Sequence, residues 1–377
     1  MGIYDDLGVK RVINADARLT RLGGSKMPPE VLAAMAEAAQ QYVDLSSLQR
    51  AVGKRLAELT RNEAAYVTTG AAAGLVLATL ACGIGQDLPA LARVIEGAPL
   101  PKDEVIIHRS HRIPYDPAIR LAGGRLIEVG NVLQTFPWEL EAAFTPRTAM
   151  VLYVAGTHVG HGALSLEQTV EIAHAHGVPV VVDAAAQLPP VENLWRFTRE
   201  QGADIAIFSG GKDLRGPQAS GLVVGRADLI EAFFVHGAPN QRLGRPMKVG
   251  REEMIGLLKA VERYLSLDHE ARMAGFEETV QRWIAALSGI PGVKPSRGFP
   301  NEAGQPVPRC LIEIDPAVTG MTAAEVRQRL WDGDPAIAVP QLDERTISIT
   351  PDVLDGDEDQ IILDRLKTIL AKTLVSA

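Results

Sequence analysis

The feature of this sequence that most restricts its fold is a succession of short, continuous apolar runs, most of them rich in β-branched residues. Apolar runs without alternation indicate strands that are covered on both faces, as in a parallel sheet. Helical or loop segments separate the runs, so crossover connections are required, and we predict an α/β domain with a largely parallel, seven-stranded sheet. The predicted strands are Ala64–Thr69, Glu104–His108, Arg125–Val129, Ala149–Val154, Val178–Asp183, Asp204–Ser209 and Gly221–Gly225.

Three helices in this part of the chain have recognisable signals. Helices are expected over Glu30–Asp44, after two prolines, and over Ser47–Leu59, where leucines and a valine form one apolar stripe. A third is predicted over Ser165–His176, with Ser165 as N-cap, Gln168 as its capping-box partner and Gly177 as the stop.

The pattern changes after a long helix predicted over Arg251–Leu267. A loop rich in glycine and proline (Gly289–Pro308) is followed by short strands and helices typical of a compact α+β domain. These are the strand Arg309–Ile314, the helix Ala323–Trp331, short strands around Ile337 and at Arg345–Ile349, and the helix Glu358–Leu370. The predicted organisation is an N-terminal arm and helix (1–45), a large α/β domain (46–265) and a small C-terminal α+β domain (266–377).

Composition excludes several classes of protein. The chain has 377 residues, of which 46% are hydrophobic and 22% charged, and these values are typical of a soluble globular protein. Its net charge of −8 argues against binding to nucleic acid, which needs clustered lysine and arginine. The two cysteines, Cys82 and Cys310, are too few and too far apart for a disulfide framework or a cysteine-based zinc site.

We expect a cytoplasmic protein. The N-terminus has acidic residues where a signal peptide needs basic and then apolar ones. The uncharged stretch Val67–Gly85 is long enough to raise the question of a membrane span, but it is mostly alanine and contains threonines and glycines, so we interpret it as a buried helix.

Three groups of polar residues come at the ends of predicted strands, where ligands bind in doubly wound sheets. Asp183 ends an apolar strand, and Lys212 follows another strand and two glycines. The third group, Thr68–Ala71, joins a strand to an alanine-rich helix, whose free N–H groups suit a phosphate. Each also has a simpler interpretation, because Asp183 or a threonine could cap a helix and a loop lysine is usually only solvated.

A lysine, a carboxylate and a phosphate cradle are together the parts of a pyridoxal 5′-phosphate site. SGGKDLRGPQASGLVVG around Lys212 resembles the lysine segment of the SelA-like branch of fold-type I pyridoxal-phosphate enzymes. VVDAAAQLPP around Asp183 resembles its aspartate segment, and INADARLTRLGGS its N-terminal arm. The similarity covers nearly the whole chain, and it implies the fold-type I transferase fold and this coenzyme.

The resemblance also implies roles for single residues. Lys212 would hold the coenzyme as a Schiff base and move the proton at Cα, and Asp183 would pair with the ring nitrogen. His111 would stack on the ring, with His108 as its rival for that role. The remaining coenzyme contacts are expected from Thr69, Gly70, Ala71, Ser209 and Gln187.

The substrate is expected to be a small anion, because bidentate guanidinium groups suit a carboxylate or phosphate. His158 lies three residues before His161, but a metal pair lacks a third ligand of suitable spacing, so we expect no metal and expect the two histidines to line the substrate pocket or merely a loop. The candidate substrate-binding residues are therefore Arg18, Arg215, Arg242, Arg245 and His158.

The family contains enzymes of more than one reaction type. The acidic chain starts almost directly at the arm, which argues against a selenium transferase that acts on seryl-tRNA. The shorter branch implies a lyase that eliminates ammonia, with loss of the β-hydroxyl, from an amino sugar acid such as D-glucosaminate 6-phosphate, giving a 2-keto-3-deoxy acid. A racemase, an aminotransferase, a selenium transferase-like enzyme and a non-catalytic relative stay open as alternatives. Fold-type I enzymes are usually homodimers, so we expect a homodimer or a higher homo-oligomer and no membrane partner.

Overall fold

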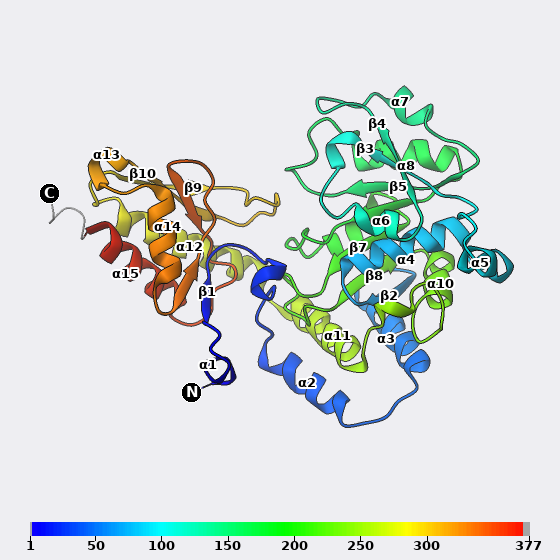
Figure 1. Cartoon of the computed structure of the whole chain (residues 1–377), viewed down its shortest axis with the longest axis horizontal. Coiled ribbons are helices and arrows are strands. Elements are labelled where there is room, and N and C mark those ends of the chain that lie inside the picture. Colours follow the sequence, from blue (N-terminus) through cyan, green and yellow to red (C-terminus); the bar gives the residue numbers. More distant parts are fainter. Residues whose placement is uncertain (1, 372–377) are drawn as a thin grey trace. The chain divides into compact units, whose positions relative to one another are not determined.

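The computed structural model describes residues 2–371 and divides the chain into two compact units (Figure 1). The larger unit is continuous, from Met27 to Ser266. The smaller unit combines the residues up to Lys26 with those from Leu267 onward. The predicted N-terminal segment 1–45 therefore contributes to both units.

The larger unit is built on a seven-stranded sheet with the order β2-β8-β7-β6-β5-β3-β4. All neighbouring pairs are parallel except those that involve β8, which is antiparallel to both β2 and β7. This confirms the predicted α/β class and the largely parallel sheet. The strands are β2 (Ala64–Thr68), β3 (Glu104–His108), β4 (Arg125–Val129), β5 (Thr148–Val154), β6 (Val180–Asp183), β7 (Ile205–Ser209) and β8 (Gly221–Gly225).

Ten helices of the larger unit surround or connect these strands (Figure 1). The predicted capping box at Ser165 and Gln168 is present at the start of α8. The helices are α2 (Pro29–Ala39), α3 (Leu45–Leu59), α4 (Ala71–Ile84), α5 (Leu88–Ile95), α6 (Pro117–Leu121), α7 (Pro137–Glu141), α8 (Leu166–Ala175), α9 (Asn193–Trp195), α10 (Ala227–His236) and α11 (Arg251–Ser266).

Two of these helices cover parts of the sheet. The alanine-rich α4 is almost wholly buried and packs on the sheet, since its side chains share one core cluster with residues of β3, β5, β6, β7 and β8. Helix α3 covers the edge strand β2: Gln49 Nε2 donates to the carbonyl oxygen of Val67 at 2.6 Å. A Cβ at Gly53 would lie 2.4 Å from the carbonyl oxygen of Ala65, so glycine permits this close approach.

The smaller unit contains an antiparallel sheet with the order β12-β10-β9 and a separate parallel pair, β1-β11. Its core includes Trp283, which is fully buried. The strands are β1 (Val12–Asn14), β9 (Val293–Gly298), β10 (Arg309–Ile314), β11 (Ala336–Ala338) and β12 (Thr346–Ile349). The helices are α1 (Ile3–Asp6), α12 (His269–Leu287), α13 (Pro316–Thr319), α14 (Ala323–Asp332) and α15 (Glu358–Ala371).

Two expectations for the smaller unit need correction. The segment 289–308 is not entirely a loop, because β9 forms within it and pairs with β10. The N-terminal arm, in which no strand was predicted, contains β1, which pairs with β11. In both cases the strand is defined by a partner that is distant in sequence, and its own residues show no strand pattern.

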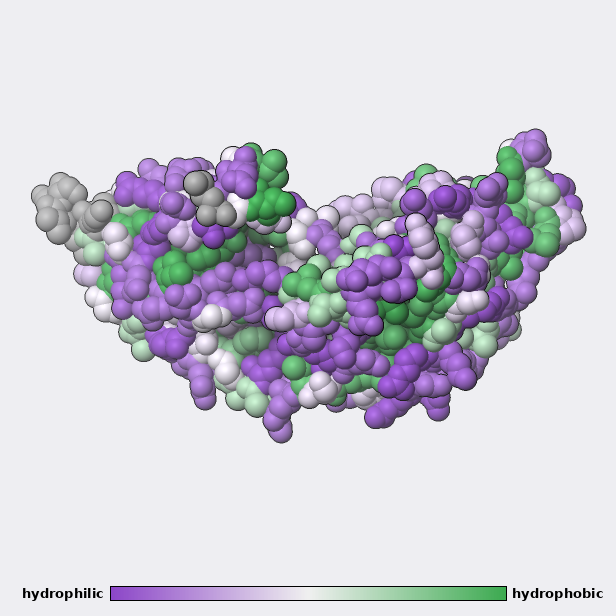
Figure 2. Space-filling model, turned by 90° about the horizontal axis from the view of Figure 1, so that it is seen from below, coloured by the Kyte–Doolittle hydropathy of each residue, from purple (hydrophilic) through white to green (hydrophobic). Residues whose placement is uncertain are grey.

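Within residues 2–371, no single helix is both long and apolar enough to cross a membrane. The pair α4 and α5 would reach the required length and composition only together, and the two helices are bent by 118°. On the face drawn in Figure 2, hydrophilic side chains predominate and hydrophobic ones gather in separate patches.

Candidate active site

The strand directions bring the predicted site residues of the larger unit to one edge of the sheet. Because β2 and β7 are both antiparallel to β8, they run in the same direction, which is also that of β3, β5 and β6. The carboxyl ends of these five strands therefore lie along one edge, where ligands bind in such sheets. Gly221, the first residue of β8, pairs with Thr68 on one side and with Ser209 on the other.

Asp183 is the last residue of β6, and its side chain is buried. Its Oδ1 accepts a hydrogen bond from the backbone N–H of Ala185 at 3.0 Å. Burial raises the pKa of Asp183 above its ordinary value, while the Ala185 hydrogen bond and the positive charge of Lys212 act in the opposite direction. Lys212 is thus near enough to interact electrostatically with this carboxylate. Such proximity is needed if both residues are to contact the same coenzyme, as predicted.

Lys212 lies in a closed loop three residues beyond the end of β7. The N–H of Gly210 donates to the carbonyl oxygen of Ser220 at 2.9 Å, and the N–H of Gly216 donates to that of Gly210 at 2.8 Å. At Gly211, a Cβ would lie 2.5 Å from the Cα of Gln218, so only glycine fits between the two backbone segments. The glycines on the amino-terminal side of the lysine therefore let the loop fold back on itself.

The other side of the lysine is held by a buried contact and an unusual backbone conformation. Asp213 accepts a hydrogen bond at 2.7 Å from the hydroxyl of Tyr264 in α11, and both side chains are buried. Arg215 has a φ of 56°, a left-handed conformation that is uncommon for a residue with a side chain, and its N–H donates to the carbonyl oxygen of Lys212 at 3.0 Å. The half-buried Arg215 side chain belongs to the same loop as the lysine.

The phosphate cradle predicted from the sequence is the start of α4. Gly70 is the N-cap, with a φ of 117°, and a Cβ there would meet no atom within 4 Å, so the space beside it is open. The Thr68 hydroxyl donates to the Gly70 carbonyl oxygen at 2.8 Å and so supports the turn. Thr69 and Ala71 are half-buried. The first N–H groups of α4 have no side-chain cap, an arrangement that suits an anion.

The two histidines that compete for the ring-stacking role differ in their hydrogen bonds. His108 is completely buried, and its Nδ1 and Nε2 lie 3.3 Å and 3.2 Å from the hydroxyls of Thr135 and Thr169. Thr169 donates its own proton to the Ser165 carbonyl oxygen, so it accepts from His108 Nε2, and Thr135 donates to Nδ1. Both nitrogens of His108 are therefore used within the protein, which favours His111 for contact with a ligand.

His111 is also completely buried, but only one of its nitrogens has a partner. Its Nδ1 accepts from the backbone N–H of Val154 at 3.2 Å, whereas no atom among residues 2–371 forms a hydrogen bond with its Nε2. The rings of His108 and Tyr153 lie edge-on to it, with centroids 5.1 Å and 4.5 Å away. Burial lowers the pKa of His111 to about 3, and His108 and His158 act in the same direction.

The end of β5 positions residues from three other segments. Val154 holds His111, and the N–H of Ala155 donates to the carbonyl oxygen of Asp183 at 3.0 Å. At Gly156, whose φ is 146°, a Cβ would lie 2.7 Å from the His158 ring and 3.1 Å from the Gln187 amide nitrogen. The absence of a side chain at Gly156 therefore lets His158 and Gln187 lie close to each other.

The remaining arginines have different surroundings. Arg18 belongs to the smaller unit, where it forms a buried ion pair of 2.6 Å with Asp352. Arg242 and Arg245 lie in the larger unit, between α10 and α11, and the former donates to the Val235 carbonyl oxygen at 2.6 Å. The Arg245 side chain is exposed. Their contact with a substrate stays a prediction.

The residues at this edge fit pyridoxal 5′-phosphate. A buried carboxylate, a lysine within its electrostatic range and an uncapped helix start with open space beside Gly70 are the groups that the coenzyme's ring nitrogen, aldehyde and phosphate need. The buried Nε2 of His111, which no described residue satisfies, is a further polar atom available to a ligand.

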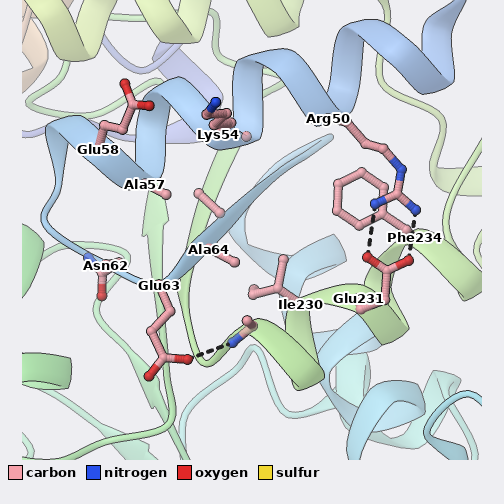
Figure 3. Close-up of a pocket in the computed structure, with 13 residues that line it drawn as sticks. Arg50, Lys54, Ala57, Glu58, Asn62, Glu63, Ala64, Ile230, Glu231 and Phe234 are labelled. Carbon is pink, nitrogen blue, oxygen red and sulfur yellow. Dashed lines mark hydrogen bonds and ion pairs between the residues drawn. The ribbon is translucent and has the colours of Figure 1, made fainter.

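A groove of about 440 Å³ in the larger unit lies away from this edge (Figure 3). Asn62–Ala65 at the amino end of β2 line it, together with residues of α3 and α10, and Arg50 forms a double hydrogen bond with Glu231 there. Because it lies at the opposite end of β2 from Gly70, it is separate from the candidate site. Among residues 2–371 no group of three or more histidine, cysteine or acidic side chains could hold a metal ion.

Three contributors to this region escaped the sequence analysis. Gly156 is a lone glycine after a strand, and that position was its only signal. Tyr264 lies 52 positions after Lys212, on the helix predicted over Arg251–Leu267, and nothing in the sequence connects it to Asp213. Tyr153 was counted as part of a strand.

Comparison with known proteins gives consistent results along the chain. Residues 12–280 match the protein family described as "SelA: L-seryl-tRNA selenium transferase". The chain is 37% identical to a 5′-C-glycyluridine monooxygenase-decarboxylase from Streptomyces sp, over 97% of this chain and 92% of that protein. It is 34% identical to a D-glucosaminate-6-phosphate ammonia lyase from Salmonella typhimurium (strain 14028s / SGSC 2262), over 97% of each chain.

Among solved structures, one of a D-glucosaminate-6-phosphate ammonia-lyase superposes with a TM-score of 0.86. The two sequences are 33% identical, and the match covers 99% of each chain. The similarity therefore extends over both units of the fold.

Proposed function

The chain belongs to the SelA family of fold-type I pyridoxal-phosphate enzymes, and from this premise we propose that it is a lyase that removes ammonia from a small, anionic amino acid. An amino sugar acid such as D-glucosaminate 6-phosphate is the leading substrate, and the product is a 2-keto-3-deoxy acid. The observation that carries the proposal is the full-length similarity, in sequence and in structure, to the ammonia lyase of that substrate.

The coenzyme is pyridoxal 5′-phosphate, and the chain offers a group for each part of it. The amine of Lys212 would hold the aldehyde, the Asp183 carboxylate would pair with the ring nitrogen, and the start of α4, with Thr69 to Ala71, would hold the phosphate. Ser209 and Gln187 would add contacts from the ends of β7 and β6. When bound, the coenzyme supplies an electron sink that makes the hydrogen on the substrate Cα acidic.

Proton transfer at Cα is assigned to Lys212. Its amine would take the proton from the substrate Cα, and the electron pair of that bond would form a Cα–Cβ double bond while the β-hydroxyl leaves. The closed loop from Gly210 to Gly216 limits the movement of the lysine backbone, which supports this role. Hydrolysis of the released product would then give the keto acid and ammonia.

Recognition of the substrate is assigned to groups near this loop. Arg215 lies three residues after Lys212, and His158 lies beside Gln187, so both would face a ligand at this edge. A guanidinium binds a carboxylate or phosphate with two parallel hydrogen bonds. Arg242 and Arg245 are the further candidates for a distal phosphate in the larger unit, and Arg18 is the candidate in the smaller one.

The proposal is tested by assaying the purified protein, loaded with coenzyme, for release of ammonia and keto acid. The substrates are D-glucosaminate 6-phosphate, unphosphorylated D-glucosaminate and D- and L-serine, so that the effects of the phosphate and of the sugar chain are separated. We expect equal amounts of ammonia and keto acid from at least the phosphorylated compound, and none from K212A. Absence of turnover on all of them would contradict the proposal.

A second candidate function is favoured by the 37% identity to the monooxygenase-decarboxylase. In this alternative the same lysine and coenzyme would act on an amino acid with uptake of O₂ and release of CO₂. An oxygen electrode distinguishes the two functions, because ammonia elimination by the proposed route consumes no O₂.

A further inference from the structure

The hydrogen bonding of His111 fixes which of its nitrogens carries a proton. A backbone N–H can only donate, so Nδ1, which receives the Val154 N–H at 3.2 Å, has no proton. In a neutral imidazole the proton then lies on Nε2. Burial keeps the ring neutral, and the neighbouring imidazoles of His108 and His158 oppose any gain of charge. His111 therefore presents an N–H group through Nε2.

That N–H group is buried and has no acceptor among the described residues. Buried donors in folded proteins almost always have an acceptor, so an orphaned one indicates a missing partner. His108, three residues away, shows the contrast: two threonine hydroxyls satisfy both of its nitrogens. The exception at His111 thus occurs at the sheet edge where Asp183 and Lys212 also lie.

The ring of His111 has little freedom to turn its N–H elsewhere. Tyr153 and His108 lie edge-on against it, and the Tyr153 hydroxyl donates to the Leu164 carbonyl oxygen at 3.3 Å. A 180° flip of the ring would put Cδ2 in the place of Nδ1 and break the hydrogen bond from Val154. The protein therefore holds the Nε2–H in one direction before any ligand arrives.

We propose that His111 is a fixed hydrogen-bond donor that binds an oxygen atom of the ligand through Nε2–H, and that it does not exchange protons with it. This inference rests on the proposed function for the identity of the ligand. The acceptor is an oxygen of the coenzyme ring or an oxygen of the substrate, and the experiment distinguishes these two sources.

The direct test is ¹⁵N NMR of the full-length protein labelled at histidine, with H111Q used to assign the His111 signals. Without coenzyme we expect a protonated Nε2 and an unprotonated Nδ1 throughout pH 5 to 8. The Nε2–H proton should then shift downfield on addition of pyridoxal 5′-phosphate if the coenzyme is the acceptor. If the substrate is the acceptor, the shift should appear only after D-glucosaminate 6-phosphate is added.

Two variants separate donation from stacking. H111Q keeps an N–H donor without an aromatic ring, and H111F keeps a ring without a donor. We expect H111F to weaken binding of the accepting ligand about tenfold, as the loss of one hydrogen bond allows, and H111Q to weaken it less. H176Q and H176F, at the C-cap histidine of α8 outside the site, are the matched controls and should bind as the unmodified protein does.

Several results would overturn the inference: a proton on Nδ1, a charged imidazole within that pH range, an Nε2–H signal unmoved by either ligand, or H111F binding as tightly as the unmodified protein. The NMR measurement is made on the unmodified protein, and H111Q serves only to assign its signals. It also separates this inference from the proposed function. A protein that shows the Nε2–H shift with coenzyme but releases no ammonia disproves only the lyase, and the reverse result disproves only the donor.

Discussion

Two histidines three positions apart, His108 and His111, are both buried and both neutral in the folded protein. Burial lowers the pKa of His108 to about 4, from an ordinary value of 6.5, and burial together with the neighbouring His108 and His158 lowers the pKa of His111 to about 3. Threonine hydroxyls stabilise the neutral form of the first, and a backbone N–H that of the second. The protein thus keeps two uncharged rings beside its candidate site at every physiological pH.

This arrangement makes the stability of the protein depend on pH. Below pH 6.5 the unfolded chain binds protons at both histidines while the folded chain does not, so the free energy of unfolding should fall as the pH falls toward 4. Each histidine contributes a slope of about 1.4 kcal/mol per pH unit well below 6.5. Urea unfolding of the unmodified protein and of H108Q, between pH 4.5 and 7.5, measures how steeply the free energy of unfolding of each protein depends on pH. Equal slopes for the two proteins would show that His108 is not held neutral.

At the scale of elements, the lysine loop depends on two backbone segments that pass very close to each other. Gly211 lies against the Cα of Gln218. Tyr264 of α11 donates a hydrogen bond to Asp213, the residue after Lys212. Strand β8 is antiparallel between β2 and β7, so Gly221 lies between the phosphate cradle and the lysine segment. Small residues in these positions allow the two site segments to come together.

We therefore expect G211A to destroy the lysine loop, because the added Cβ would lie 2.5 Å from the backbone of Gln218. Binding of pyridoxal 5′-phosphate, measured by absorbance titration, should be lost or weakened at least tenfold. The control is G275A in α12, where a Cβ meets no atom within 4 Å and alanine should stabilise the helix by about 0.5–1 kcal/mol. Coenzyme binding by G211A that equals that of G275A would contradict this account of the loop.

The regular elements of the larger unit were predicted closely, whereas part of the smaller unit was not. All seven strands of the large sheet lie where their apolar runs indicated, and Ser165 begins α8 as its capping box predicted. Helix α12 received no prediction, because only Val280, Trp283 and Leu287 of its nineteen residues are buried and the apolar face is short. Strand β9 contains Pro295 and borders only one other strand, so its sequence lacks a strand pattern.

At the scale of the whole molecule, the larger unit exposes apolar side chains that a monomer in water rarely exposes together. Val132 and Leu133 follow β4 within four residues and Trp138 lies in α7, and their exposed fractions are 70%, 82% and 67%. Contiguous exposed apolar residues indicate an interaction surface, whereas a lone one such as Leu121 does not. This supports the expectation that the protein forms a homodimer or a higher homo-oligomer.

Light scattering after size-exclusion chromatography should accordingly give a mass of at least twice 40.4 kDa. L133E should shift the protein toward smaller species if this loop lies in the contact, and L121E, at a comparable exposure, should leave the mass unchanged. A monomeric mass for the unmodified protein at micromolar concentration would disprove the expectation.

The sequence by itself determined the parallel sheet, and it predicted Lys212, Asp183 and the start of α4 as coenzyme-binding groups, because each depends on residues that are neighbours in the chain. Only the tertiary structure distinguished the surroundings of His108 from those of His111, since Thr135, Thr169 and Val154 are distant in sequence and meet these rings only after folding. The ion pair between Arg18 and Asp352 and the close approach of Gly211 to the backbone of Gln218 were likewise visible only in the folded structure. Local patterns specify which residues form an element, and packing specifies which polar atoms remain for a ligand.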